Sequence, residues 1–132
     1  VVHSFCFGET LAVPLFRAMR ERTTHPVART ALDRILSDEA VHRAFGWKTL
    51  DALLQVDASG VRTLAASILP QTVDHFFHAY GAVPDALRLT EAESTVGLLP
   101  PIDYRSLFAN TWAHDIQPRF QRREVATPAE HW

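Results

Sequence analysis

Apolar side chains recur every three or four residues through most of this 132-residue chain, and that spacing most limits how it can fold. Such spacing gathers apolar side chains on one side of an α-helix, whereas a half-buried strand alternates them. Only five glycines interrupt the sequence, so long helices can form. The pattern therefore predicts an all-α protein built from amphipathic helices.

The first 56 residues predict two helices joined by a short turn. The first helix is expected from about residue 2 to Arg22, with a kink at Pro14. The turn begins at Thr23, and Pro26 suits the first position of a second helix that ends near Gln55. A turn this short forces the two helices to lie antiparallel.

The remaining residues predict further helices. After a break at residues 57–60, a third helix with Leu64 on its buried side is expected to end near Gly81. Thr90-x-x-Glu93 has the spacing of a capping box, which opens a short helix. Asp103 is expected to cap a final helix that ends or kinks at Pro118. We expect one domain over residues 1–132, divided into a hairpin at 1–56, additional helices at 57–123 and a tail at 124–132.

Three polar side chains interrupt the apolar sides of the first two helices. Glu39 and His42 stand three residues apart, so one side of the second helix presents a carboxylate and an imidazole together. Glu9 lies on the apolar stripe of the first helix, at a similar height because it is about as far from the turn as Glu39. A lone buried glutamate is costly unless a cation or hydrogen bonds offset its charge, so a bound metal is expected here. The inward stripe of the second helix is expected to contain Ala28, Ala31 or Leu32, Ile35, Glu39, His42, Gly46, Thr49 and Leu53.

Two segments, Gly8-Glu9-Thr10 and Asp38-Glu39-Ala40-Val41-His42-Arg43-Ala44-Phe45-Gly46-Trp47, carry a family resemblance. They resemble the ferritin-like di-iron carboxylate superfamily, in which each half of a four-helix bundle gives a Glu from one helix and Glu-x-x-His from the next. The resemblance covers roughly the first 50 residues. It is specifically to the second, C-terminal half of such a bundle, so it implies a ferritin-like helical bundle.

The resemblance also implies roles for individual residues. Glu9 and Glu39 would bridge or cap two metal ions, iron or manganese, and His42 would bind one of them. Asp38 would accept a hydrogen bond from a ligand histidine and orient it. Each residue also has a plain structural interpretation: Glu39 and His42 as a surface pair at helical spacing, and Asp38 as a solvated charge.

The other residues that could bind a metal or take part in chemistry are expected to have structural roles instead. Cys6, one turn before Glu9, is typical of a small core residue. His75 and His78 have no carboxylate at matching positions, so we expect partly exposed histidines. Trp47, Phe45 and Phe16 are expected in the core, where their bulk would keep the site dry. The single cysteine also excludes a thiolate metal site and an internal disulfide.

Half of the ligands that a two-metal site needs are missing from this sequence. It has one Glu-x-x-His, whereas the superfamily pattern uses two. The chain begins at Val1 rather than Met, and its first residues already fit a helix interior. We therefore expect either that this is the C-terminal part of a longer protein, or that another polypeptide or a second copy of the chain completes the bundle.

Charge and composition exclude several partner classes. Thirteen basic against fifteen acidic side chains give a net charge of −2, without the basic surface that nucleic acids or anionic membranes attract. No signal peptide or spanning apolar segment is present, so a cytoplasmic protein is expected. The expected function is an oxygen-activating oxidase or oxygenase that acts on a small molecule. The alternatives are a ferroxidase that handles iron and a metal-free helical interaction protein.

Overall fold

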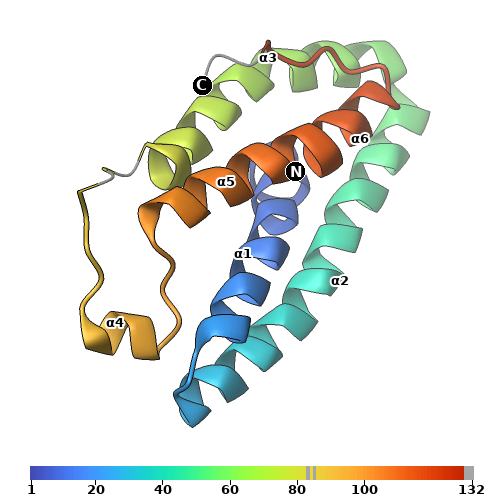
Figure 1. Ribbon diagram of the computed structural model, residues 1–132. Coiled ribbons are helices and arrows are strands. Elements are labelled where there is room, and N and C mark those ends of the chain that lie inside the picture. Colours follow the sequence, from blue (N-terminus) through green and yellow to red (C-terminus); the bar gives the residue numbers. More distant parts are fainter. Residues whose placement is uncertain (83, 85, 130–132) are drawn as a thin grey trace.

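The computed structural model describes residues 1–82, 84 and 86–129, and every regular element in this part of the chain is helical. The prediction of an all-α helical bundle is confirmed (Figure 1). With η denoting a π-helix, the elements are η1 (Val2–Gly8), α1 (Glu9–Arg22), α2 (Pro26–Val56), α3 (Ala58–Phe76), η2 (Phe77–Gly81), α4 (Glu91–Thr95), α5 (Pro101–Thr111), η3 (Trp112–Ile116) and α6 (Gln117–Gln121).

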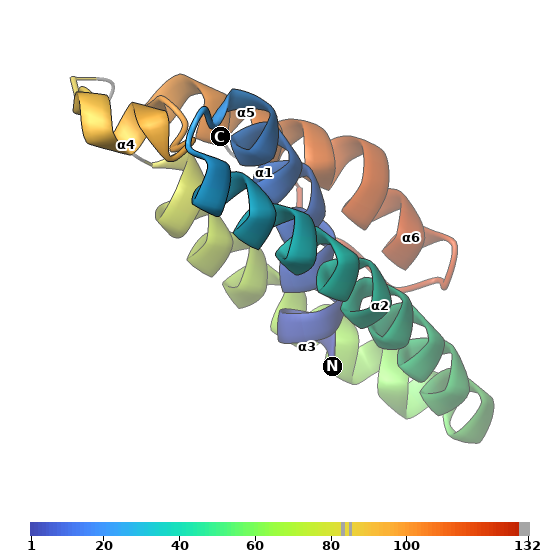
Figure 2. The same cartoon turned by 90° about the horizontal axis from the view of Figure 1, so that it is seen from below.

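The predicted hairpin is present, with α1 and α2 side by side along most of their length (Figures 1 and 2). Pro26 occupies the first turn of α2, where its missing N–H removes no helical hydrogen bond. Just before it, the His25 ring accepts a hydrogen bond from the Ala28 N–H at 3.4 Å. These local signals fix the position of the turn. The position of the turn then sets which residues of α1 and α2 lie opposite each other.

The first predicted helix differs from expectation because its first seven residues form a π-helix. The Cys6 N–H donates to the Val1 carbonyl, five residues back, and the Glu9 N–H donates to Ser4 in the same way. Each wider turn holds an extra residue compared with an α-helix, so it changes which side chains face the neighbouring helix. The π segment therefore sets the direction in which the Glu9 side chain points.

A glycine lets η1 approach α2 closely. A Cβ atom added to Gly46 would lie 2.6 Å from the Phe5 carbonyl carbon, well inside normal contact. The Cys6 thiol donates to the Gly46 carbonyl oxygen at 3.4 Å across the same contact. Gly46 therefore holds the chain immediately before Glu9 against the helix that carries Glu39.

The hydrophobic core lies on one side of the α1–α2 hairpin, where η1, α1 and α2 meet α3, α5, η3 and α6 (Figure 2). Its aromatic side chains stack on one another; the Phe7 ring, for example, lies 5.7 Å from that of Trp112. Buried members of the core are Cys6, Phe7, Leu11, Trp47, Leu50, Ala65, Leu69, Val73, Phe108, Trp112, Ile116, Phe120 and Val125.

Several positions predicted to be buried are exposed. Phe45, expected in the core, is 52% exposed, and the side chain of His42, expected on the inward stripe of the second helix, is 49% exposed. Leu53 is 42% exposed and Leu64 is 61% exposed, although both were expected on buried stripes. In α2 the buried positions are Leu32 and Gly46, both on the predicted stripe, together with Trp47 and Leu50. Because the later helices cover only one side of the hairpin, the core-facing stripe of α2 is rotated partly away from the predicted one.

The C-terminal part also differs from prediction. Asp103 lies inside the first turn of α5, which begins at Pro101, and forms an ion pair with Arg22 at 2.7 Å instead of capping the helix. The helical segment continues past Pro118, because this proline falls in the first turn of α6. Val125, in the predicted tail, is buried in the core. Residues 130–132 of that tail lie outside the described residues.

Other local predictions are confirmed. The capping box at Thr90 and Glu93 opens α4, with both reciprocal hydrogen bonds present. Asp57 is the break expected after α2, and it caps α3 by accepting the Gly60 N–H at 2.9 Å. Within the described residues, no helix is both long and apolar enough to cross a membrane.

Candidate metal centre

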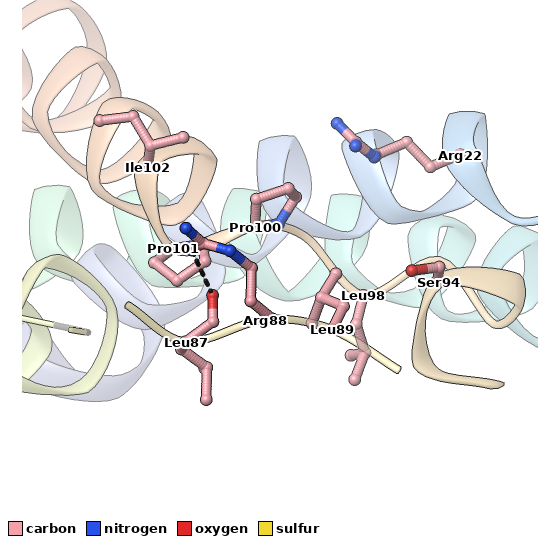
Figure 3. Close-up of a pocket in the computed structure, with 9 residues that line it drawn as sticks. All are labelled: Arg22, Leu87, Arg88, Leu89, Ser94, Leu98, Pro100, Pro101 and Ile102. Carbon is pink, nitrogen blue, oxygen red and sulfur yellow. Dashed lines mark hydrogen bonds between the residues drawn. The ribbon is translucent and has the colours of Figure 1, made fainter. Parts of the chain in front are cut away.

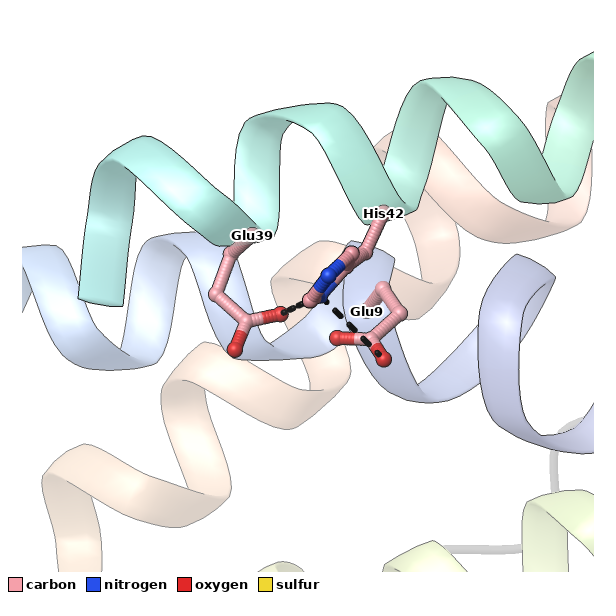
Figure 4. A group of neighbouring side chains, drawn as sticks. All are labelled: Glu9, Glu39 and His42. Atoms are coloured by element: carbon pink, nitrogen blue, oxygen red, sulfur yellow. Dashed lines mark ion pairs between the residues drawn. The ribbon is translucent and has the colours of Figure 1, made fainter. Parts of the chain in front are cut away.

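The structure brings Glu9, Glu39 and His42 together between two antiparallel helices (Figure 4). Glu9 is the first residue of α1, and the other two come from successive turns of α2. The His42 Nδ1 atom lies 3.7 Å from Glu39 Oε2 and 4.0 Å from Glu9 Oε1. One ligand atom from each residue lies within 4.8 Å of the others.

The three side chains differ in burial. The Glu39 side chain is only 16% exposed, and its Oε2 atom is buried without a hydrogen-bond partner among the described residues. Leaving a buried carboxylate oxygen unpaired costs free energy. The His42 side chain, by contrast, is 49% exposed. The centre is therefore buried at Glu39 and open to solvent at the His42 imidazole.

The environment of Glu9 favours its neutral form. Burial first, then hydrogen bonding with Glu39 and the negative charge of that residue, raise the pKa of Glu9 from 4.5 to about 7, while His42 opposes the shift. Two carboxylates this close cannot both ionise without cost. A cation between them would reverse this effect, because it favours both charged forms.

The raised Glu9 pKa predicts a pH dependence for the metal-free fold. Because the folded state holds the Glu9 proton more tightly than the unfolded state, the stabilisation is fully present below pH 4.5 and is lost as pH rises through about 7. The melting temperature of metal-free protein should therefore fall over this interval by more than that of Glu9→Gln, which cannot ionise there. Parallel melting curves for the two proteins would contradict the assignment.

Behind Glu9, a buried hydrogen bond ties the two helices together. The Trp47 indole N–H donates to the Thr10 hydroxyl oxygen at 2.9 Å, one residue after Glu9. The indole also lies under the guanidinium groups of Arg119 and Arg123, at 5.4 and 4.9 Å from the ring centre. Trp47 is a core residue, as predicted, and it links the Glu9 backbone to both α2 and α6.

A second set of contacts joins α2, beside His42, to the C-terminal helices. The Arg43 guanidinium donates to Asp115 at 2.6 Å, and Asp115 also accepts from Arg119. Sequence reasoning missed this network and the Trp47–Thr10 bond, because they join residues far apart in the chain. The only sequence signal was the placement of Thr10 and Arg43 immediately after two candidate ligands.

Asp38 does not take the predicted orienting role within this chain. Its side chain is exposed, and it makes no hydrogen bond or ion pair with His42 or any other described residue. The predicted role needs a ligand histidine within hydrogen-bond distance, and that histidine is not supplied by the described part of the chain.

The cluster includes neither Cys6 nor any other described histidine. His3 contacts Thr72 at 3.3 Å and stacks near His75, while His78 lies 3.4 Å from Asp74. Burial raises the pKa of the Cys6 thiol to about 12, so this residue stays protonated and is unsuited to metal binding. Among the described residues, no other group of three histidine, cysteine or acidic side chains converges as Glu9, Glu39 and His42 do.

A separate pocket lies away from the cluster. A pocket of about 880 Å³ lies beside α4 and the start of α5 (Figure 3). Its lining includes Leu87, Leu98 and Pro100, and none of the three clustered residues. The described residues that line this pocket include no carboxylate or imidazole.

Exposed apolar side chains lie on the same side of α2 as His42 and extend from it toward the C-terminal end of the helix. Phe45, Leu53 and Val56 follow His42 by three, eleven and fourteen residues, which places them within about 60° of it around the helix. They are 52%, 42% and 86% exposed. Phe5 packs edge-on against Phe45, with ring centres 5.2 Å apart. We call these four residues, Phe5, Phe45, Leu53 and Val56, the open face.

The three clustered side chains fit a metal centre. With metal–ligand bonds of about 2.1 Å, two atoms on one ion lie at most roughly 4.2 Å apart, which accommodates both His42 distances. An ion would also give the unpaired Glu39 Oε2 atom its missing partner. Comparison of this chain with protein-family models, with curated protein sequences and with solved structures finds no match.

Proposed function

We propose that this protein is a ferritin-like carboxylate protein that binds a pair of iron or manganese ions and activates oxygen to oxidise a small organic molecule. The observation that carries the proposal is the convergence of Glu9, Glu39 and His42 within 4.8 Å, with the Glu39 Oε2 atom buried and unpaired. A structural role for these residues does not account for a buried carboxylate oxygen that has no hydrogen-bond partner and lies 3.7 Å from the His42 imidazole.

The donor set favours iron or manganese. Carboxylate oxygens with one imidazole suit these ions, whereas soft thiolate ligands favour zinc or copper(I). Cys6, the single cysteine, donates its thiol hydrogen to Gly46 inside the core. Bound iron would supply the electrons and open coordination positions that reduction of oxygen requires.

The protein residues have separate parts in this proposal. Glu9 and Glu39 supply negative charge that balances the metal ions, and His42 supplies a neutral nitrogen ligand. Trp47, through Thr10, and Gly46, through Phe5, keep α1 and η1 in place against α2. Holding ligands at fixed separations before the metal arrives reduces the cost of binding it.

The test has two stages. Metal-free protein is first titrated with Fe²⁺ without oxygen, and we expect saturable binding that Glu39→Gln weakens. The loaded protein is then exposed to oxygen with a panel of small aromatic and aliphatic compounds. Oxygen uptake coupled to an oxidised organic product supports the proposal, and no saturable binding of iron or manganese overturns it.

The exposure of the centre favours one alternative. Because the His42 side chain is 49% exposed, ions could enter and leave freely, as a ferroxidase that handles iron requires. That protein would consume oxygen in proportion to added Fe²⁺ and release Fe³⁺, with no organic product. The exposed apolar face would also suit a metal-free interaction protein, which metal titration separates from both.

A further inference from the structure

The metal centre proposed above is incomplete within one chain, and the inference here rests on that proposed function. One copy brings two carboxylates and one imidazole together. A two-metal carboxylate site in a helical bundle uses about four carboxylates and two histidines. One chain therefore supplies half of the required set, all from one side.

The missing ligands can approach only from the open face. The core helices α3, α5, η3 and α6 cover the other side of the hairpin, where Trp47 and Leu50 are buried. On the open side, His42 is half exposed, Phe45 exposes apolar surface one turn from it, and Leu53 does so three turns along the same side of α2. Exposed apolar side chains on one side of a helix mark a contact site in soluble proteins.

We propose that two copies of this chain pair through the open face about a two-fold axis beside Glu9, Glu39 and His42. A two-fold axis brings the same patch of each copy together, so the apolar residues of the open face would cover each other. The same operation doubles the ligands to four carboxylates and two imidazoles. One contact would therefore cover the exposed apolar surface of the single chain and also supply its missing ligands.

Charge makes this pairing depend on metal. Without cations, the contact brings four carboxylates together, and their repulsion opposes association. Two divalent ions neutralise that charge. The pairing also gives Asp38 a role, because this exposed side chain lies one residue before Glu39, on the margin of the open face. A carboxylate in that position can accept a hydrogen bond from His42 of the partner subunit and orient it as a ligand.

The test measures solution mass and bound metal together. The unmodified chain is studied by sedimentation, first with a chelator and then at increasing Mn²⁺ concentrations. We expect a 14.8 kDa monomer with chelator and a species of twice that mass with Mn²⁺, containing one ion per chain. His42→Ala should stay monomeric at Mn²⁺ concentrations that pair the unmodified chain.

A surface variant separates pairing from ligand loss. Phe45→Glu places a charge on the open face without removing a ligand, and we expect at least a tenfold weaker dimer. The control is Ile102→Glu, at a similarly exposed apolar position on α5, which should pair normally. Circular dichroism verifies that both variants fold.

The outcomes distinguish this inference from the proposed function. A chain that binds Mn²⁺ saturably but stays monomeric overturns the pairing and leaves the metal centre supported. In that case, the open face would instead bind another polypeptide segment that carries its own Glu and Glu-x-x-His. A chain that binds no metal overturns both, and a dimer that forms equally with chelator overturns the metal-dependent contact.

Discussion

His42→Ala is expected to lower the affinity for Fe²⁺ or Mn²⁺ by more than about 100-fold while the fold survives. Loss of an outer-shell partner of a metal ligand typically costs roughly 10- to 100-fold, and loss of the ligand itself should cost more. The fold should survive because the His42 side chain is half exposed and packs in no core. The measurement is a titration of metal-free protein, with helix content followed by circular dichroism.

His78→Ala is the matched control for that experiment. Its ring is also exposed and also lies near a carboxylate one turn earlier, 3.4 Å from Asp74 of α3, but it is not part of the cluster. This variant should bind metal as the unmodified chain does. Equal metal binding by both alanine variants would show that the ions bind elsewhere.

Gly46→Ala is expected to destabilise the protein by about 2 kcal/mol and also to weaken metal binding. Alanine improves helix propensity by about 1 kcal/mol, but its Cβ would lie 2.6–2.7 Å from three atoms of Phe5, two of them backbone. Backbone cannot rotate away, so η1 must move from α2, and strain of this kind costs roughly 1–3 kcal/mol or more. The displaced segment immediately precedes Glu9, which explains the expected loss of metal affinity.

Gly8→Ala tests whether the close approach, rather than any new methyl group, is responsible. A Cβ atom there would meet the end of the Phe76 side chain at 3.2 Å, and it would lie at an ordinary contact distance of 3.6 Å from the His3 carbonyl oxygen. The Phe76 ring can shift slightly, and the gain in helix propensity offsets the cost, so stability should be nearly unchanged. Denaturant unfolding compares the two variants directly, and equal stabilities would contradict the packing described for η1 and α2.

Local signals in the sequence were sufficient for the hairpin and for the convergence of the cluster. Pro26 marks the start of α2, and a turn from Thr23 to His25 fixes the antiparallel pairing. From the turn, a rise of about 1.5 Å per residue places Glu9 and Glu39 at matching heights. These statements need only chain spacing and helix geometry, and the structure has the three side chains together.

What the sequence could not provide depends on tertiary packing. Leu53 lies on an apolar stripe, but whether that stripe is buried depends on where α3, α5 and α6 lie. The same holds for Val125, which looked like part of a polar tail and is buried. In both cases the deciding neighbour is distant in sequence, so periodicity within one helix carries no information about it.

The π-helix before Glu9 had no recognisable signal. Residues 2–8 fit an α-helical pattern, and the extra residue per turn follows from the close contact at Gly46 rather than from local propensity. Likewise, Thr10 gave no indication that it would accept the Trp47 indole N–H. The convergence of Glu9, Glu39 and His42 was therefore predictable, but the contacts that hold these residues in position were not.

X-ray absorption at the iron edge of the Fe²⁺-loaded protein tests the central claim most directly. If Glu9, Glu39 and His42 hold a pair of ions, the spectrum should show a shell of oxygen and nitrogen atoms at about 2.0–2.2 Å and a second iron at roughly 3.5–4 Å. The imidazole of His42 should add its characteristic outer-shell scattering, absent in His42→Ala. Iron surrounded by water oxygens alone, with no second iron and no change in the variant, would contradict the two-metal centre.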